Sequence, residues 1–183
     1  MPKLQNLDKI PIVLALLAFF IIPLTTIVAL NSQDIRQKAS MAGEAVMFLD
    51  PVSITTQVGE EVIVKVYVNT SGSQIEGADI ALKYDPNYLE LVDNTINPGL
   101  VLESYTGRTV DARKGMAFIR AVGGSYQGVR GKLAEATFKT KQSGITQINL
   151  YQASGGLQEC AVWQSENGGD ILGATMGSTI EIN

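Results

Sequence analysis

Acidic side chains are the first candidates for chemistry, because the 183 residues of this sequence include no histidine. Without histidine, histidine-based triads, histidine metal sites and histidine general bases are excluded. A glycoside hydrolase needs two acids roughly 5–10 Å apart across a cleft, whereas Glu60 and Glu61 are adjacent and lie at a predicted turn. No Gly-x-Ser-x-Gly elbow is present, and Gly123-Gly124 is not followed by the Lys-Ser/Thr and helix of a phosphate loop. We therefore predict that the protein is not an enzyme.

Side-chain oxygens of the kind that calcium prefers gather in one segment, on Asp85, Asn87, Asp93 and Asn94. These residues do not follow the twelve-residue pattern of a calcium loop, so we predict no cofactor and keep calcium as the alternative. The single cysteine, Cys160, excludes an intrachain disulfide. We expect Cys160 to be a small buried hydrophobe, with a reactive or intermolecular thiol as the alternative.

Four aromatic residues could stack on sugar rings, since an exposed ring offers an apolar face; they are Tyr105, Tyr126, Tyr151 and Trp163. A carbohydrate platform usually needs several such rings on one flat face. The only tryptophan, Trp163, follows two apolar residues, which indicates partial burial. Tyr105, Tyr126 and Trp163 are the candidates for carbohydrate contacts, and a core or rim position is the competing interpretation.

The stretch from residue 77 to residue 92 organises the rest of the chain. Alternation in an extended strand places Ile80, Leu82 and Tyr84 on the core side. Asp79 and Lys83 fall on the opposite side. Because aspartate has a poor propensity for the middle of a strand, Asp79 is either a binding residue or a solvated face residue.

Short strands separated by turns account for the chain after residue 46. A proline corner at residues 85–87 ends the strand that carries Asp79. The strands that we predict cover residues 46–49, 53–57, 61–69, 77–84, 89–92, 116–122, 132–140, 146–151 and 179–182, with weaker ones at 100–104 and 108–112. Residues 123–128 are interpreted as a flexible tip and residues 152–176 as irregular. About nine or ten short strands without a soluble helix predict an all-β antiparallel sandwich, either immunoglobulin-like or a jelly roll.

The N-terminal region differs from this pattern. Residues 10–30 carry no charge and are long enough to cross a hydrocarbon core of roughly 30 Å as a helix. We predict a cytoplasmic head over residues 1–9, a transmembrane helix or signal anchor over 10–30, a linker over 31–45 and an extracytoplasmic domain over 46–183. A cleaved secretory signal, which would release the domain, is the alternative, although the apolar region of such signals is only about 7–15 residues.

The charge of the β-rich part argues against nucleic acid as a partner. The whole chain has a net charge of −4, and the residues after position 46 include ten basic and fifteen acidic side chains. A phosphate backbone is bound by a basic stripe, which such an acidic domain lacks.

The order of several short motifs resembles the cohesin domain family. The principal runs are Gly77-Ala78-Asp79 with an apolar residue next, Leu82-Lys83-Tyr84-Asp85-Pro86, and Leu89-Glu90-Leu91-Val92. Supporting runs are Val58-Gly59-Glu60-Glu61-Val62, residues 131–139, Ser143-Gly144-Ile145-Thr146 and residues 177–182. The resemblance covers residues 46–183 and implies a jelly-roll sandwich of two packed sheets.

The resemblance also implies a function in attachment. In cohesin families the partner is a dockerin module of a secreted glycan-degrading enzyme, so we expect a membrane-anchored binding module at the cell surface. Asp79 would then hydrogen-bond the partner from one sheet face, with Lys83 and Arg120 adding polar contacts around apolar ones. Gly77 departs from the family pattern, in which a polar residue can occupy this position.

Two alternatives stay open. Relatives of the fold include carbohydrate-binding modules, so the ligand could be a cell-surface or plant-type polysaccharide. The chain could also be a structural subunit of a surface filament or membrane complex that assembles through its N-terminal helix. Fold resemblance does not transfer function by itself, so the surface has to decide between these ligands. Exposed aromatic rings would favour a glycan, whereas an apolar patch ringed by charge would favour a protein.

Overall fold

The computed structural model of the chain describes residues 44–152 and 159–183. The predicted head, the predicted membrane segment and residues 31–43 of the predicted linker lie outside the described residues. Within the described ranges, no helix combines the length and the apolar character needed to cross a membrane.

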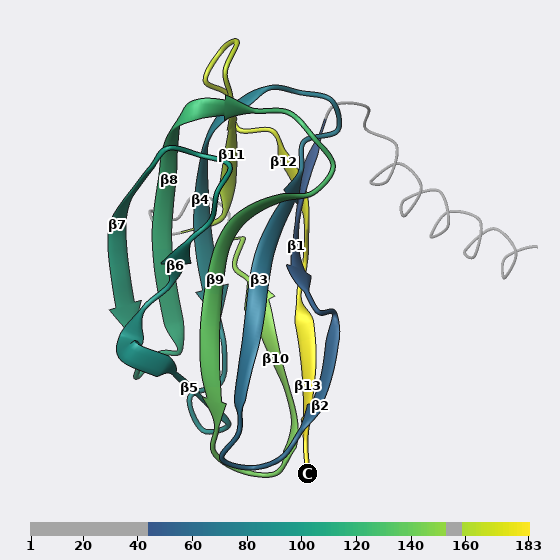
Figure 1. Ribbon diagram of the computed structural model, residues 1–183, viewed down its shortest axis with the longest axis vertical. Helices are drawn as coiled ribbons and strands as arrows, with labels where there is room; N and C mark the ends of the chain where they lie inside the picture. The colour runs from purple at the N-terminus through teal and green to yellow at the C-terminus, as the bar shows by residue number, and fades with distance from the viewer. Residues whose placement is uncertain (1–43, 153–158) are drawn as a thin grey trace, which may run out of the picture. The chain divides into compact units, whose positions relative to one another are not determined.

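One sheet, which we call the β3–β9 sheet, is built around two long strands (Figure 1). Its strands are β1 (Ala45–Asp50), β3 (Glu61–Asn69), β5 (Leu89–Leu91), β6 (Asn97–Pro98), β9 (Gly131–Thr140) and β12 (Leu172–Met176). Their order is β12-β1-β3-β9-β5, and β6 also pairs with β9.

The other sheet, which we call the β4–β8 sheet, contains the stretch that carries Asp79. Its strands are β2 (Ser53–Thr56), β4 (Ile75–Lys83), β7 (Ser104–Asp111), β8 (Met116–Tyr126), β10 (Gly144–Leu150), β11 (Ala161–Gln164) and β13 (Ser178–Ile182). Their order is β2-β13-β10-β4-β8-β7, and β11 also pairs with β4. The predicted all-β sandwich of two sheets is confirmed; two strand pairs, β1–β12 and β2–β13, are parallel.

The core lies between the two sheets because each sheet has an apolar inner face. In β3 the valines at positions 62, 64, 66 and 68 are buried, and the intervening residues are exposed or half-buried, as the period of two requires. From the opposite sheet Ile80, Ile119 and Ile148 join the same buried cluster. The Tyr84 ring meets Phe138 of the β3–β9 sheet edge-on, with ring centroids 5.0 Å apart, so the core-side assignment of Tyr84 is confirmed.

The predicted corner after β4 is closed by Asp85. Its Oδ1 accepts hydrogen bonds from the backbone N–H and the side-chain amide of Asn87, both at 2.9 Å. Pro86 lies between them and fixes φ. This turn, followed by β5 and a short 3-10 helix, η2 (Val92–Asn94), transfers the chain from the β4–β8 sheet to the β3–β9 sheet.

Three sequence-based assignments were wrong. The two weak strands at 100–104 and 108–112 are replaced by the single strand β7. Residues 123–126, interpreted as part of a flexible tip, continue β8. The segment interpreted as irregular contains β11 and β12, whose pairing partners lie far away in the sequence.

Candidate functional site

The candidate site is the outer face of the β4–β8 sheet, which points away from the β3–β9 sheet. The residues of β4 and β8 that enter the core include Ala78, Ile80, Ala117 and Ile119, so the residues that alternate with them point outward. The outer face, as we use the term, consists of Gly77, Asp79, Lys83, Met116, Arg120, Val122 and Trp163. Register places Asp79 of β4 between Arg120 of β8 and Ala161 of β11.

Asp79 and Arg120 form a two-pronged ion pair on this face. Arg120 Nε donates to Asp79 Oδ1 and Nη2 donates to Oδ2, each at 2.7 Å. The hydrogen bonds from Arg120 to the Asp79 carboxylate raise the pKa of the guanidinium. A planar guanidinium matches a carboxylate in this geometry, so the orientation of the Arg120 side chain is set by Asp79.

Of the two interpretations of Asp79 that the sequence left open, the solvated face residue is contradicted by the burial of its side chain. Its side chain does point to the outer face, but only 7 % of it is exposed, compared with 44 % of the Arg120 side chain. The reason is the register, since Arg120 lies directly opposite and covers the carboxylate. A carboxylate this buried needs a charged or hydrogen-bonding partner, and Arg120 of the same chain is that partner.

Trp163 packs beside this pair and explains Gly77. The two residues are paired in register, and a Cβ on Gly77 would lie 2.6 Å from Cε3 of the Trp163 ring. The guanidinium carbon of Arg120 lies 5.1 Å from the centroid of the same ring, within the range of a cation–π contact. A polar side chain at position 77, as the family pattern allows, would displace the ring.

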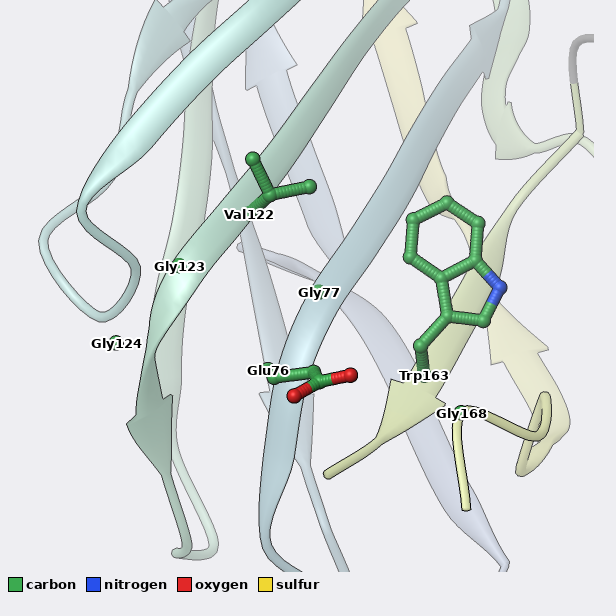
Figure 2. A pocket seen from close by; sticks show the side chains of 7 residues that line it. All are labelled: Glu76, Gly77, Val122, Gly123, Gly124, Trp163 and Gly168. Atoms are coloured by element: carbon green, nitrogen blue, oxygen red, sulfur yellow. The ribbon is translucent and has the colours of Figure 1, made fainter. Parts of the chain in front are cut away.

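An open hollow of about 560 Å³ lies next to the Trp163 ring. Its lining residues are Glu76, Gly77, Val122, Gly123, Gly124, Trp163 and Gly168. Figure 2 shows the Trp163 ring beside Gly77, the Glu76 side chain next to Gly77 along the same strand, and Val122 on the neighbouring strand. Of these residues, only Trp163 and Gly77 had been singled out from the sequence as relevant to binding.

Lys83 lies at the other end of β4. Its ammonium nitrogen is 5.4 Å from the centroid of the Tyr151 ring, and it lines a second hollow of about 550 Å³ together with Ile145 and Asn149. Ile145 is 70 % exposed. Lys83 and Arg120 therefore share a sheet but not a hollow.

The three candidate carbohydrate residues do not share a face. Tyr105 of β7 pairs with the core residue Ala121 and packs against the core. Tyr126, at the end of β8, also packs against the core, and its ring lies so close to Gly131 that a Cβ there would meet it at 2.5 Å. Only Trp163 lies on the outer face, so the three rings form no common platform.

Cys160 occupies the position of a small buried hydrophobe. Its Sγ lies 3.3 Å from the Ala81 backbone nitrogen, which donates to it, and 3.4 Å from the Ala81 carbonyl oxygen. Burial raises the pKa of the thiol to about 12, which keeps it protonated and poorly nucleophilic.

Two aspartates with turn positions, Asp85 and Asp170, have structural roles. Asp85 closes the corner after β4. Asp170, in the segment interpreted as irregular, accepts hydrogen bonds at Oδ1 from the backbone N–H groups of Val162 and Leu172, at 2.9 and 3.0 Å. In the part of the chain that the structure describes, no three His, Cys, Asp or Glu side chains are grouped so that they could hold a metal ion.

Solved structures with a similar fold are cohesins of several kinds. A chain of a type I cohesin–dockerin complex from Clostridium thermocellum has a TM-score of 0.60 at 14 % identity, and the match covers 77 % of this chain and 94 % of that one. A type II cohesin domain from the cellulosome of Acetivibrio cellulolyticus has a TM-score of 0.59 at 17 % identity, with coverages of 76 % and 95 %. A non-cellulosomal cohesin from the archaeon Archaeoglobus fulgidus has a TM-score of 0.56 at 15 % identity, with coverages of 76 % and 91 %.

Sequence comparison agrees with the fold. A search of curated proteins gives no match. The family model described as "Cohesin domain" matches residues 47–162, from β1 into β11. Cohesin domains are non-catalytic binding modules, and this chain belongs to the cohesin domain family.

Proposed function

We propose that this chain is a cell-surface cohesin module that captures a dockerin-type protein through the outer face of the β4–β8 sheet. The observation that carries the proposal is the arrangement of Arg120 and Trp163 on that face, with the guanidinium held by Asp79. Tryptophan and arginine are the residues that most often dominate the binding free energy of protein interfaces. Support also comes from the similar structures that are described as cohesins in complex with dockerins.

The roles of the predicted site residues follow from their positions. Arg120, which is substantially exposed, contacts the partner directly, and Trp163 supplies apolar area beside it. Asp79 positions Arg120 and does not itself reach the partner, because only 7 % of its side chain is exposed. Lys83 contributes at the edge of the contact surface, where charged residues add little to affinity.

We further propose that the uncharged segment 10–30 anchors the module in a membrane with the domain on the extracytoplasmic side. Its length supports a membrane-spanning helix. Cohesins are usually extracellular or cell-surface scaffold modules, which is the side of the membrane that this topology requires.

Direct binding to a panel of dockerin modules tests the main proposal. The full chain, kept in mild detergent, is immobilised, and dockerin binding is measured by interferometry. We expect Arg120→Ala to weaken binding by about tenfold or more. The matched control is Lys139→Ala, which removes an exposed positive charge from the opposite sheet and leaves binding unchanged. Equal losses in both variants, or no capture of any dockerin, would contradict the proposal.

Glycan binding is the second candidate, and Trp163 is the observation that favours it. This ring lines an open hollow on the outer face, where an aromatic surface can stack on a sugar. Retention of the chain on insoluble polysaccharide, lost in Trp163→Ala and kept in Tyr105→Phe, would establish this function. Passage through the polysaccharide unretarded would exclude it.

A further inference from the structure

The hollow beside Trp163 is lined by an acidic side chain, Glu76, whose outward orientation does not follow from simple alternation along β4. In strict alternation Glu76 would point toward the core, because Gly77 and Asp79 point outward. The pairing of β4 with β8 shifts register between Ile75 and Gly77, and such a bulge re-aims one side chain. As a result Ile75 stays buried while Glu76 is exposed and lines the hollow.

A second carboxylate packs against two of the glycines that line the hollow. The backbone N–H of Glu103 donates to the carbonyl of Gly123, which holds this residue against the hairpin edge. A Cβ on Gly124 would lie 3.0 Å from Cγ and 3.2 Å from Oε1 of Glu103. The carboxylate of Glu103 is therefore packed over Gly124, one of the lining residues.

These two charges are not neutralised by the described residues. Among residues 44–152 and 159–183, neither Glu76 nor Glu103 has a cation within salt-bridge distance. The nearby Arg120 gives both prongs of its guanidinium to Asp79. The hollow is thus lined by the Trp163 ring, by glycines and by the carboxylate of Glu76, and the carboxylate of Glu103 lies against the lining residue Gly124.

We propose that this hollow receives a cationic side chain, lysine or arginine, from the protein that docks on the outer face. Carboxylates attract the charge, and the Trp163 ring adds a cation–π contact of the kind that it already makes with Arg120. The glycine floor leaves room for the long stem of such a side chain. This inference rests on the proposed function, since it specifies the chemistry of the partner at the same face.

A small cation tests the hollow without any partner. Trp163 is the only tryptophan of the chain, so its fluorescence reports directly on this site. We expect methylguanidinium chloride to change the fluorescence of the full chain with saturation in the millimolar range, and matched sodium chloride to have no such effect. Glu76→Gln weakens this response by about threefold to tenfold. The matched control Glu61→Gln, on the β3–β9 sheet, leaves it unchanged. A response that is the same in both variants, or in both salts, overturns the inference.

Binding to a dockerin separates this inference from the proposed function. For any dockerin that the chain captures, we expect Glu76→Lys to weaken affinity by about tenfold and replacement of the responsible lysine or arginine of the dockerin by glutamate to restore affinity for Glu76→Lys. Capture that is indifferent to Glu76→Lys overturns the cationic-residue inference and leaves the proposed function standing. A saturating methylguanidinium response without capture of any dockerin supports the hollow and counts against the proposed function.

Discussion

At the scale of single residues, Asp79 and Arg120 couple stability to the candidate binding face. Removing Arg120 leaves a carboxylate that is largely buried and has lost both hydrogen-bond donors. We expect Arg120→Ala to lower the free energy of unfolding by about 1–3 kcal/mol, measured by urea denaturation. The estimate stays below that of a fully buried pair, because water can enter once the half-exposed arginine is gone.

A double-mutant cycle separates this effect from the loss of other Arg120 contacts. In the background Asp79→Ala, the change Arg120→Ala should lower the free energy of unfolding much less than it does in the natural chain, because no carboxylate remains to be left unpaired. Costs that simply add would show that the ion pair contributes nothing to stability.

Gly77 and Trp163 form a second pair whose members depend on each other. Gly77→Ala places a Cβ 2.6 Å from the ring, so the ring must move. We expect a shift of the Trp163 emission maximum and a loss of about 1–3 kcal/mol in the free energy of unfolding. In the background Trp163→Ala the same change at position 77 should be nearly neutral, and a full cost there would disprove the explanation given for this glycine.

Cys160 predicts a dependence of stability on pH. The pKa of the folded thiol, raised to about 12 by burial, lies above its ordinary value of 9.0. The protonated thiol therefore contributes fully to the stability of the folded state below pH 9.0. This contribution is lost as the pH rises through about 12, since the unfolded thiol ionises first.

Two measurements check this prediction. Between about pH 8 and about pH 10, the urea midpoint of the natural chain should fall more than that of Cys160→Ala, which lacks the titrating group. A thiol-specific disulfide reagent should label the native chain slowly and the urea-unfolded chain at once. Rapid labelling of the native chain would mean that Cys160 is accessible.

At the scale of elements, the sequence predicts strands well where their own side chains alternate. The valines of β3 have a clear period of two, Ile80 and Leu82 of β4 alternate with Asp79 and Lys83 in the sequence, and glycine or proline turns mark the ends of both strands. β11 and β12 were missed because both are short and have no such period. They exist as strands because β11 pairs with β4 and β12 pairs in parallel with β1, across more than eighty residues of sequence.

The candidate site was predictable in position but not in geometry, for the same reason. Asp79 and Lys83 follow from alternation within one strand. That Arg120 lies opposite Asp79, and that Trp163 lies over Gly77, depends on register between strands that are distant in the sequence. The bulge that exposes Glu76 has no local sequence signal.

The turn between β11 and β12 helps to hold the strand that carries Trp163. Oδ1 of Asp170 accepts hydrogen bonds from the N–H groups of Val162 and Leu172. We expect Asp170→Ala to cost about 1–2 kcal/mol in the free energy of unfolding. Hydrogen exchange should show faster exchange of these two amides, while that of Val64 in β3 stays unchanged. Asp170→Asn, which keeps one oxygen acceptor, should recover most of the protection; equal exchange in all three chains would remove Asp170 from this role.

At the scale of the whole molecule, the proposed membrane anchor and the proposed contact surface belong to different parts of the chain. The cohesin domain carries its own hydrophobic core between two sheets, so the fold of the domain has no need of residues 10–30. The acidic excess after residue 46 favours a partner that presents positive charge, which agrees with the chemistry proposed for the hollow.

The proposed anchor predicts that the full chain fractionates with membranes. Expressed in a bacterial host, it should sediment with the membrane fraction and resist extraction by alkaline carbonate, because about twenty apolar residues hold it in the hydrocarbon core. Deletion of residues 10–30 should release the chain without changing the fluorescence of Trp163.

Protease added to spheroplasts should digest the domain if it faces outward, and a domain protected until the membrane is opened would reverse the proposed orientation. A chain of reduced mass in the soluble extracytoplasmic fraction would instead establish the cleaved-signal alternative, since cleavage removes the apolar segment and leaves nothing to hold the domain at the membrane.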